Sequence, residues 1–231
     1  RQWGSITPGH PERDLAHGIE NSSGPLGQGH AYAAGAAIAE KFLEARLGHT
    51  MMQHKIYAYI SDGGVQEGIS SEVGRLAGTL GLNNLIMFYD ANDIQLSTEC
   101  GAVMCEDTAM KYQAWGWNVL KIDGNDPDAI RAALNAANKE EQRPTLIIGK
   151  TVMGKGALQA DGSSYEHNIK THGAPLGGEA YTNTIKNLGG DLNDPFKIFP
   201  EVQKLYDDRN AELRQIVAER HATEDAWKKQ N

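Results

Sequence analysis

The chain has 231 residues, of which 40% are apolar and 23% are charged. This composition is ordinary for a globular protein and argues against an intrinsically disordered chain. The net charge of −8 disfavours nucleic acid or an anionic membrane surface as the main partner, although a local anion site is compatible with it.

The first predicted elements are a helix, a strand and a second helix. Residues 27–47 are rich in Ala and Gly, and small residues let a helix pack closely, so we expect this helix to be buried. Residues 56–60 form an apolar run typical of a buried strand. Residues 69–80 predict a helix that places Val73, Leu76, Ala77 and Leu80 on one face and stops at Gly81.

The next part of the chain repeats this alternation. Apolar runs predict strands at residues 85–89, 117–122 and 145–149, and helices are predicted at 107–115 and 126–139. Asp126 is the expected N-cap of the second of these helices. Further helices are predicted at 179–188 and, as a charged amphipathic helix, from Pro200 to about residue 222.

Strands that alternate with helices predict an α/β fold, a parallel sheet with helices on both faces. Ligands of such sheets bind beyond the carboxyl ends of the strands. We expect a domain over residues 1–195 and a helical linker over 196–231. The chain begins without Met, as a processed, split or trimmed polypeptide would, and we expect it to be truncated at both ends.

Two features predict a cytoplasmic protein. Cys100 and Cys105 lack the spacing of a zinc site and are expected to be free thiols in a reducing compartment. We find no apolar run of about 18 residues and no signal peptide, so a transmembrane segment is not expected.

Asp62 and Asn92 follow consecutive predicted strands, whose carboxyl ends are neighbours in a parallel sheet. A carboxylate, an amide oxygen and a backbone carbonyl can there converge on Mg²⁺, with Ca²⁺ as an alternative. Gly63 and Gly64 would let the backbone approach a phosphate closely. The pattern alone leaves open that Asp62 is only a turn or cap residue.

Asp62-Gly63, Glu67-Gly68 and Asn92 together resemble the thiamine-diphosphate signature. Five further blocks, at residues 7–12, 24–29, 107–110, 115–117 and 172–176, are similar to transketolases and stand in the family's order. The resemblance covers residues 7–176, and it implies the thiamine-diphosphate-binding domain of that family.

The resemblance assigns the metal and diphosphate ligands. Asp62 and Asn92 would bind the divalent ion through side-chain oxygens, and Ile94 would bind it through its carbonyl. The Gly63 N–H would meet the diphosphate. His172 would reach the diphosphate and the donor sugar.

The resemblance also assigns residues around the cofactor rings and the substrate. Gly24 and Leu26 would lie beside the aminopyrimidine and thiazolium rings, and Leu96 would pack on the cofactor. His10 would line the substrate channel, and Glu67 would lie at the interface of a homodimer, between two cofactors. Without the resemblance, Leu26 and Leu96 could equally be core residues.

The chain departs from the family's pattern at several positions. Ser61 replaces a glycine, Gly64 replaces a larger residue, and His30 stands where an apolar residue is commoner. Residues 97–98 replace an Asp-Gly pair, and the segment 162–170 is longer than usual. None of these changes removes a metal donor.

The resemblance implies a two-carbon ketol transfer between a ketose phosphate and an aldose phosphate, as in the pentose phosphate pathway. In the family, a glutamate and a ring clamp come from the following domain of the partner subunit, so we expect the isolated chain to be inactive. Two alternatives are a non-catalytic subunit of a split transketolase and a sister enzyme such as a dihydroxyacetone synthase or a phosphoketolase.

Overall fold

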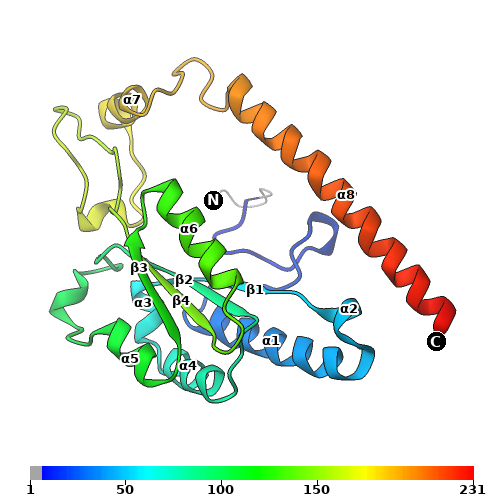
Figure 1. Cartoon of the computed structure of the whole chain (residues 1–231). Helices are drawn as coiled ribbons and strands as arrows, with labels where there is room; N and C mark the ends of the chain where they lie inside the picture. The colour runs from blue at the N-terminus through cyan, green and yellow to red at the C-terminus, as the bar shows by residue number, and fades with distance from the viewer. Residues whose placement is uncertain (1–6) are drawn as a thin grey trace. The chain divides into compact units, whose positions relative to one another are not determined.

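A computed structural model describes residues 7–231 of the chain (Figure 1). Within that range, no helix has both the length and the apolar character needed to span a membrane. The chain forms two compact units. The described part of the first comprises residues 7–39 and 54–153, and the second comprises residues 40–53 and 154–231.

A four-stranded parallel sheet lies in the first unit. Its strands are β1 (Ile56–Ser61), β2 (Leu85–Ala91), β3 (Asn118–Asp123) and β4 (Thr145–Lys150). They are arranged in the order β1-β2-β4-β3, and every pair is parallel. The register pairs the last residue of β1, Ser61, with Asp90 of β2, so the carboxyl ends of the strands line one edge of the sheet. The predicted fold class is confirmed.

The helices in the described residues are α1 (Gln28–Leu47), α2 (His49–Met52), α3 (Asp62–Gln66), α4 (Gly68–Thr79), α5 (Thr108–Ala114), α6 (Pro127–Asn138), α7 (Gly178–Asn187) and α8 (Pro200–Gln230). Six of these eight helices were predicted, whereas the short helices α2 and α3 were not. Short 3-10 turns lie at Leu15–His17, Cys100–Ala102 and Ile169–Thr171. The Asp126 side chain accepts a hydrogen bond from Asp128 N–H, which confirms the predicted N-cap of α6.

Helices cover both faces of the sheet because successive strand residues point in opposite directions. On one face, Met87 and Leu146 pack with Ala34 and Ala37 of α1, and Val73 and Ala77 of α4 belong to the same apolar cluster. On the other face, Phe88 and Ile147 pack with Ala133 and Ala137 of α6 (Figure 1).

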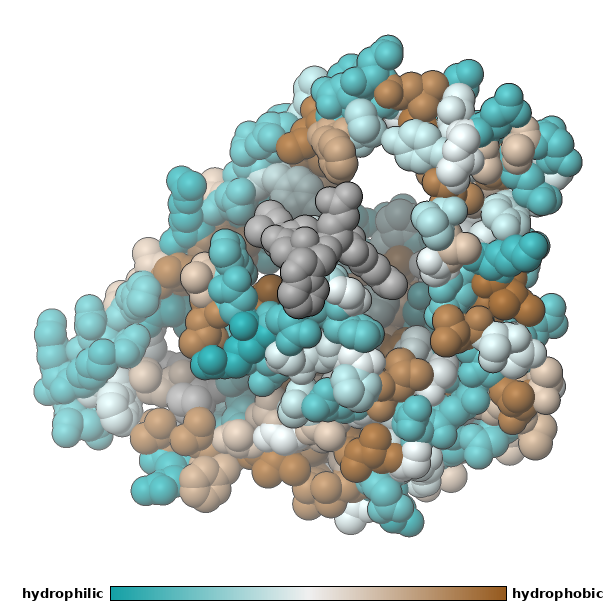
Figure 2. Space-filling model, turned by 180° about the vertical axis from the view of Figure 1, so that it is seen from behind, coloured by the Kyte–Doolittle hydropathy of each residue, from teal (hydrophilic) through white to brown (hydrophobic). Residues whose placement is uncertain are grey.

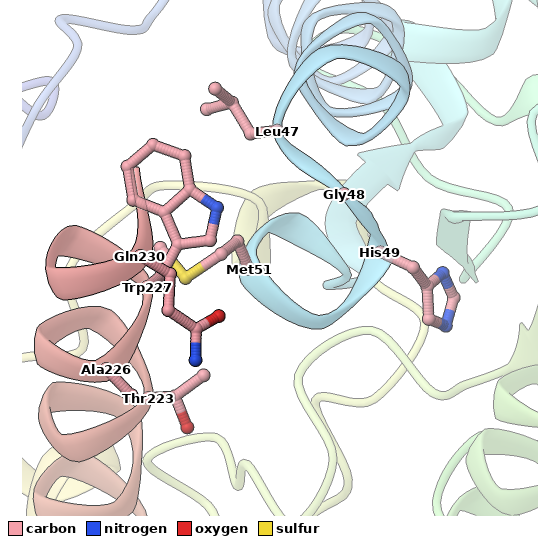
Figure 3. Close-up of a pocket in the computed structure, with 8 residues that line it drawn as sticks. All are labelled: Leu47, Gly48, His49, Met51, Thr223, Ala226, Trp227 and Gln230. Carbon is pink, nitrogen blue, oxygen red and sulfur yellow. The ribbon is translucent and has the colours of Figure 1, made fainter.

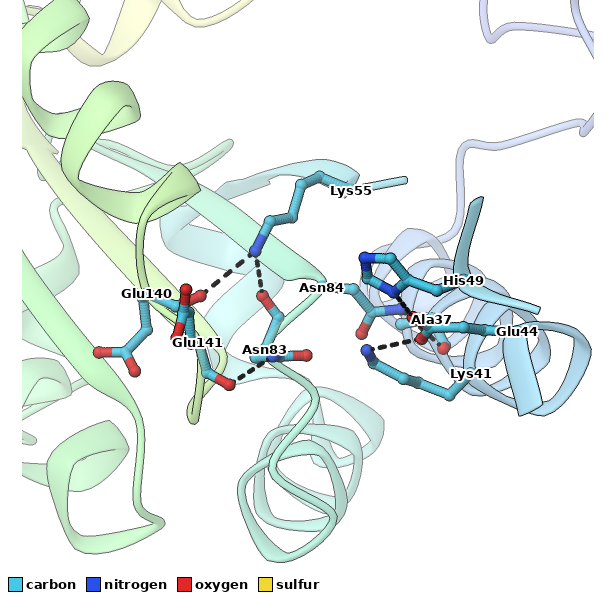
Figure 4. A network of polar contacts seen from close by, with 9 residues as sticks. All are labelled: Ala37, Lys41, Glu44, His49, Lys55, Asn83, Asn84, Glu140 and Glu141. Carbon is cyan, nitrogen blue, oxygen red and sulfur yellow. Dashed lines mark hydrogen bonds and ion pairs between the residues drawn. The ribbon is translucent and has the colours of Figure 1, made fainter. Parts of the chain in front are cut away.

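The sheet edge opposite the predicted site is fixed by polar contacts (Figure 4). The Lys55 ammonium, just before β1, donates to the carbonyls of Asn83 at 2.7 Å and Glu140 at 3.3 Å. The Asn84 amide donates to the Ala37 carbonyl of α1 at 2.9 Å. These bonds satisfy backbone groups where the chain enters the strands.

The predicted apolar face of α4 is only partly buried. In α4, Val73 and Ala77 are buried, but Leu76 and Leu80 are 46% and 51% exposed. The helix therefore buries a narrower stripe than its apolar residues suggested. Helix α1 likewise buries Ala33, Ala34 and Ala37 while its Tyr32 and Ile38 lie at the surface.

Further apolar side chains lie at the surface, and Figure 2 shows apolar residues among the hydrophilic ones. On β1, Tyr57 and Tyr59 are 56% and 75% exposed, and Tyr59 stacks on Phe88 with ring centroids 5.0 Å apart. Helix α8 is longer than predicted, since it continues to Gln230, and it contains no buried residue.

Candidate functional site

Asp62 lies at the carboxyl end of β1 and is only 2% exposed. Its Oδ1 accepts a hydrogen bond from the Tyr89 hydroxyl at 2.6 Å. Its Oδ2 accepts bonds from the backbone N–H groups of Asn92 and Asp93, each at 3.0 Å. A buried carboxylate needs such donors. Here they attach the end of β1 to the loop that follows β2.

Asn92 continues this arrangement. It is 8% exposed, and its Oδ1 accepts a hydrogen bond from Ile94 N–H at 3.0 Å. The residues predicted to bind a divalent ion are therefore joined by direct contacts, from Asp62 to Asn92 and from Asn92 to Ile94. Their carboxylate, amide and carbonyl oxygens are hard donors that fit Mg²⁺ or Ca²⁺.

The metal site predicted here contains a single carboxylate. Across residues 7–231, no group of three or more His, Cys, Asp or Glu is placed to hold a metal ion. A metal bound at Asp62 would therefore depend on the amide and carbonyl oxygens, and on oxygens that a phosphate ligand brings with it.

Tyr89 and Cys100, two neighbours of Asp62, have raised pKa values. Burial, followed by the hydrogen bond to Asp62, raises the pKa of Tyr89 well above its usual range. Burial, together with the Asp62 charge, raises the pKa of the Cys100 thiol to about 12. Tyr89 and Cys100 therefore act as neutral neighbours of the carboxylate and not as nucleophiles.

The loop before α1 lies on the turn after Asp62. A Cβ atom on Gly63 would be 3.0 Å from Leu26 Cδ1, so Leu26 covers this glycine. Leu26 is 53% exposed and Leu96 is 80% exposed. Neither is a core residue, so the alternative that both belong to the apolar core is wrong, and both offer apolar surface to a ligand.

The same loop brings further predicted site residues together. A Cβ on Gly24 would lie 2.8 Å from Cγ of the exposed His10. A Cβ on Gly27 would lie 3.0 Å from Glu67 Cβ, and Gly27 has a φ of +80°, so glycine is favoured there on both counts. The loop and the turn from Asp62 to Glu67 therefore form one continuous surface.

His172 belongs to the second unit, directly after the turn Ile169–Thr171. Its Nδ1 is buried and has no hydrogen-bond partner among the described residues. A buried nitrogen without a partner is energetically costly. It is therefore a suitable contact for a polar ligand.

Sequence reasoning gave no role to His30, yet it lies close to this site. His30 is 3% exposed, and its Nδ1 is 2.6 Å from Ser70 Oγ. Ser70 Oγ in turn donates to the Gly64 carbonyl at 2.6 Å. The sequence did contain one signal for His30, because it is a polar residue within an Ala-rich helix that was predicted to be buried. Tyr89 was missed because it continues an apolar strand and reads as core.

The buried imidazole predicts a loss of stability in acid. Burial lowers the pKa of His30 to about 4, below the value of 6.5 for an exposed histidine. Between these values the unfolded chain binds the proton and the folded chain does not, so stability falls as the pH drops below 6.5. We expect a loss of about 2 kcal/mol by pH 5. Urea titrations at pH 7 and pH 5 measure it, and a His30→Leu variant that loses as much would contradict it.

Open pockets also lie away from these residues (Figure 3). One of about 410 Å³ is formed within the second unit by α2, α8 and the end of α1, and Figure 3 shows Trp227 beside Leu47 and Met51. Another of about 740 Å³ is lined by residues between Thr7 and Ile19. The residues that line them are not those of the predicted site.

Comparisons with known proteins identify the family of the chain. A family described as "Transketolase, thiamine diphosphate binding domain" matches residues 1–231. "Transketolase 2" of Vibrio parahaemolyticus is 47% identical over 206 residues, which cover 87% of this chain and 30% of the relative.

Solved transketolase structures match as well. The one from Campylobacter jejuni has a TM-score of 0.83 and 38% identity, covering 97% of this chain and 34% of that chain. One from Pichia stipitis, in complex with sedoheptulose 7-phosphate, has a TM-score of 0.88 and 31% identity, covering all of this chain and 34% of that chain. The chain thus spans about a third of the length of these relatives.

Proposed function

The chain belongs to the transketolase family, as its thiamine-diphosphate-binding domain, and from that premise we propose that it supplies the metal and diphosphate half of a ketol-transfer site. The reaction moves a two-carbon unit from a ketose phosphate to an aldose phosphate. The Pichia stipitis structure with sedoheptulose 7-phosphate supports substrates of this class.

One observation carries the proposal. The Asp62 carboxylate lies within 3.0 Å of the Asn92 backbone N–H, so the two residues meet where β1 and β2 end. Asp62, Asn92 and the Ile94 carbonyl would hold Mg²⁺, which neutralises part of the diphosphate charge. The Gly63 N–H would donate to a phosphate oxygen.

The remaining residues orient the bound groups. When bound, thiamine diphosphate supplies a nucleophilic carbon and an electron sink. Leu26 and Leu96 would cover its rings and exclude water from them. His10 and His172 would donate hydrogen bonds to the sugar or to the diphosphate, for which His172 Nδ1 is unpartnered among the described residues.

The assembly and the location follow from the same proposal. Glu67 would lie at the contact between two copies in a homodimer, and the protein would act in the cytoplasm. Because the chain spans about a third of its relatives, groups from outside it would complete the site. We therefore expect the isolated chain to bind the cofactor without catalysing ketol transfer. Measurable transfer from xylulose 5-phosphate by this chain would contradict that expectation.

Calorimetric titration of thiamine diphosphate tests the proposed site. With Mg²⁺ present, the chain is expected to bind, and EDTA is expected to abolish binding. Asn92→Ala should weaken binding by about tenfold or more, because it removes a metal ligand and the acceptor of Ile94 N–H.

Asn118 provides the matched control. It is an asparagine of the same sheet at the opposite edge, where its amide donates to Thr145 Oγ1 at 3.2 Å. Asn118→Ala is expected to bind the cofactor like the unaltered chain. Thiamine diphosphate binding that EDTA does not affect would refute the proposed site. An equal loss of affinity in Asn92→Ala and Asn118→Ala would refute it as well.

A further inference from the structure

Three positions at which the chain departs from the family pattern meet around one glycine. Ser61 Oγ accepts a hydrogen bond from Gly64 N–H at 3.2 Å. A Cβ on Gly64 would lie 3.3 Å from Ser61 Oγ and 3.9 Å from His30 Cε1. A Cβ at position 64 would therefore press on the Ser61 hydroxyl and come into ordinary van der Waals contact with the imidazole. The three residues form one packed unit although His30 lies more than thirty positions away from the other two.

The direction of the hydrogen bonds is fixed by chemistry. The Gly64 carbonyl can only accept, so the Ser70 hydroxyl donates its one hydrogen to it, at 2.6 Å. Ser70 Oγ can then only accept from His30 Nδ1, 2.6 Å away. His30 Nδ1 therefore carries a hydrogen, and the imidazole is neutral at pH 7 because burial lowers the pKa of His30 to about 4. Ser70 is 1% exposed, so water does not compete for these bonds.

This network fixes both the backbone N–H and the backbone C=O of Gly64. Ser61 accepts from its N–H, while Ser70 donates to its C=O, which also accepts from Glu67 N–H at 3.4 Å. Gly63 lies between this fixed residue and Asp62, whose carboxylate is fixed by three hydrogen bonds of its own. The Gly63 peptide therefore has little freedom to rotate.

We propose that His30 is a positioning residue that acts through Ser70 and Gly64 to aim the Gly63 N–H at a phosphate group. The proposal rests on the proposed cofactor site and adds a residue from α1 to it. His30, on α1, places its imidazole beside the turn that follows β1. There its Nδ1–H supplies the hydrogen-bond donor that reaches Ser70 Oγ. An apolar side chain at position 30 would leave the Ser70 hydroxyl with an unused acceptor.

The test compares two replacements of His30. In His30→Asn, the side-chain NH₂ occupies nearly the place of Nδ1 and can donate to Ser70. In His30→Leu, the donor is lost. Two readouts are followed: the rate of amide hydrogen exchange over residues 62–67 without ligand, and the Kd for thiamine diphosphate with Mg²⁺.

We expect His30→Leu to speed the exchange and to raise the Kd, each by about tenfold. His30→Asn should stay within about twofold of the unaltered chain in both. Ser70→Ala should reproduce the effect of His30→Leu, and the double variant should be no worse than either single one. His221→Leu, at an exposed histidine of α8, is the control and should change neither readout.

Two results would overturn the proposal. One is unchanged exchange over residues 62–67 in either His30→Leu or Ser70→Ala, so that the remaining variant still decides if the other fails to fold. The other is an Asn variant that behaves like the Leu variant, since packing alone would then explain the effect. Failure of the unaltered chain to bind thiamine diphosphate would refute the proposed function, whereas the exchange rates would still show whether His30 holds the turn.

Discussion

Replacement of Asp62 with alanine is expected to abolish Mg²⁺-dependent binding of thiamine diphosphate and to lower the free energy of unfolding by about 3–5 kcal/mol. The variant loses the only carboxylate of the proposed metal site. It also leaves the Tyr89 hydroxyl and the N–H groups of Asn92 and Asp93 without their acceptor in a buried place. Calorimetry measures the binding, and urea denaturation measures the stability.

Asp161 is a suitable control for this variant. Its Oδ1 also accepts hydrogen bonds from a local backbone N–H and a hydroxyl, both of Ser163, but the residue is exposed. Water can replace its carboxylate, so Asp161→Ala should cost less than about 1 kcal/mol and leave binding unchanged. If Asp62→Ala were as stable as Asp161→Ala, the buried network described around Asp62 would be wrong.

The second large effect is expected for Gly78→Ala in α4. The added Cβ would lie 1.8 Å from the Trp115 carbonyl oxygen and 3.2 Å from Trp117 Cδ1. Backbone atoms cannot move aside as a flexible side chain can, so α4 would have to separate from the turn before β3. That shift would also disturb the hydrogen bond from Trp117 Nε1 to the Gly74 carbonyl, now 2.7 Å long. We expect a loss of about 3 kcal/mol or more.

Gly35→Ala is the matched control, because it is also a glycine within a helix. Nothing lies within 4 Å of a Cβ placed on Gly35. Alanine is the better helix former, so this variant should gain up to about 1 kcal/mol. Urea denaturation of both variants gives the comparison. Equal stability of the two variants would mean that α4 does not approach Trp115 as closely as described.

The strands could be predicted from sequence because each is a short apolar run, and their alternation with helices fixed the parallel sheet. All four were placed to within two residues of their observed bounds. The exposure of Leu76 and Leu80 could not be predicted, because an apolar residue looks the same in the chain whether or not a neighbour covers it. The predicted boundary between residues 195 and 196 stays a prediction.

The site was predictable in part for the same kind of reason. Consecutive parallel strands bring Asp62 near Asn92, so their contact follows from topology. The contacts of His30 and Tyr89 do not, because each depends on the exact distance between a helix or strand and a turn far away in the sequence. The spacing of apolar residues along the chain gives no information about such a distance. The pairing of Gly24 with His10 is of the same kind.

Helix α8 has a further consequence. It buries no residue, and exposed ion pairs such as Lys204–Asp208 and Lys228–Glu224 connect its successive turns. Such pairs contribute only a few tenths of a kcal/mol each and weaken as salt is added. The helix and the sheet therefore need not melt in one cooperative transition. A melting temperature taken from helical content alone would mix two processes, and a probe within the sheet is required to follow its thermodynamics.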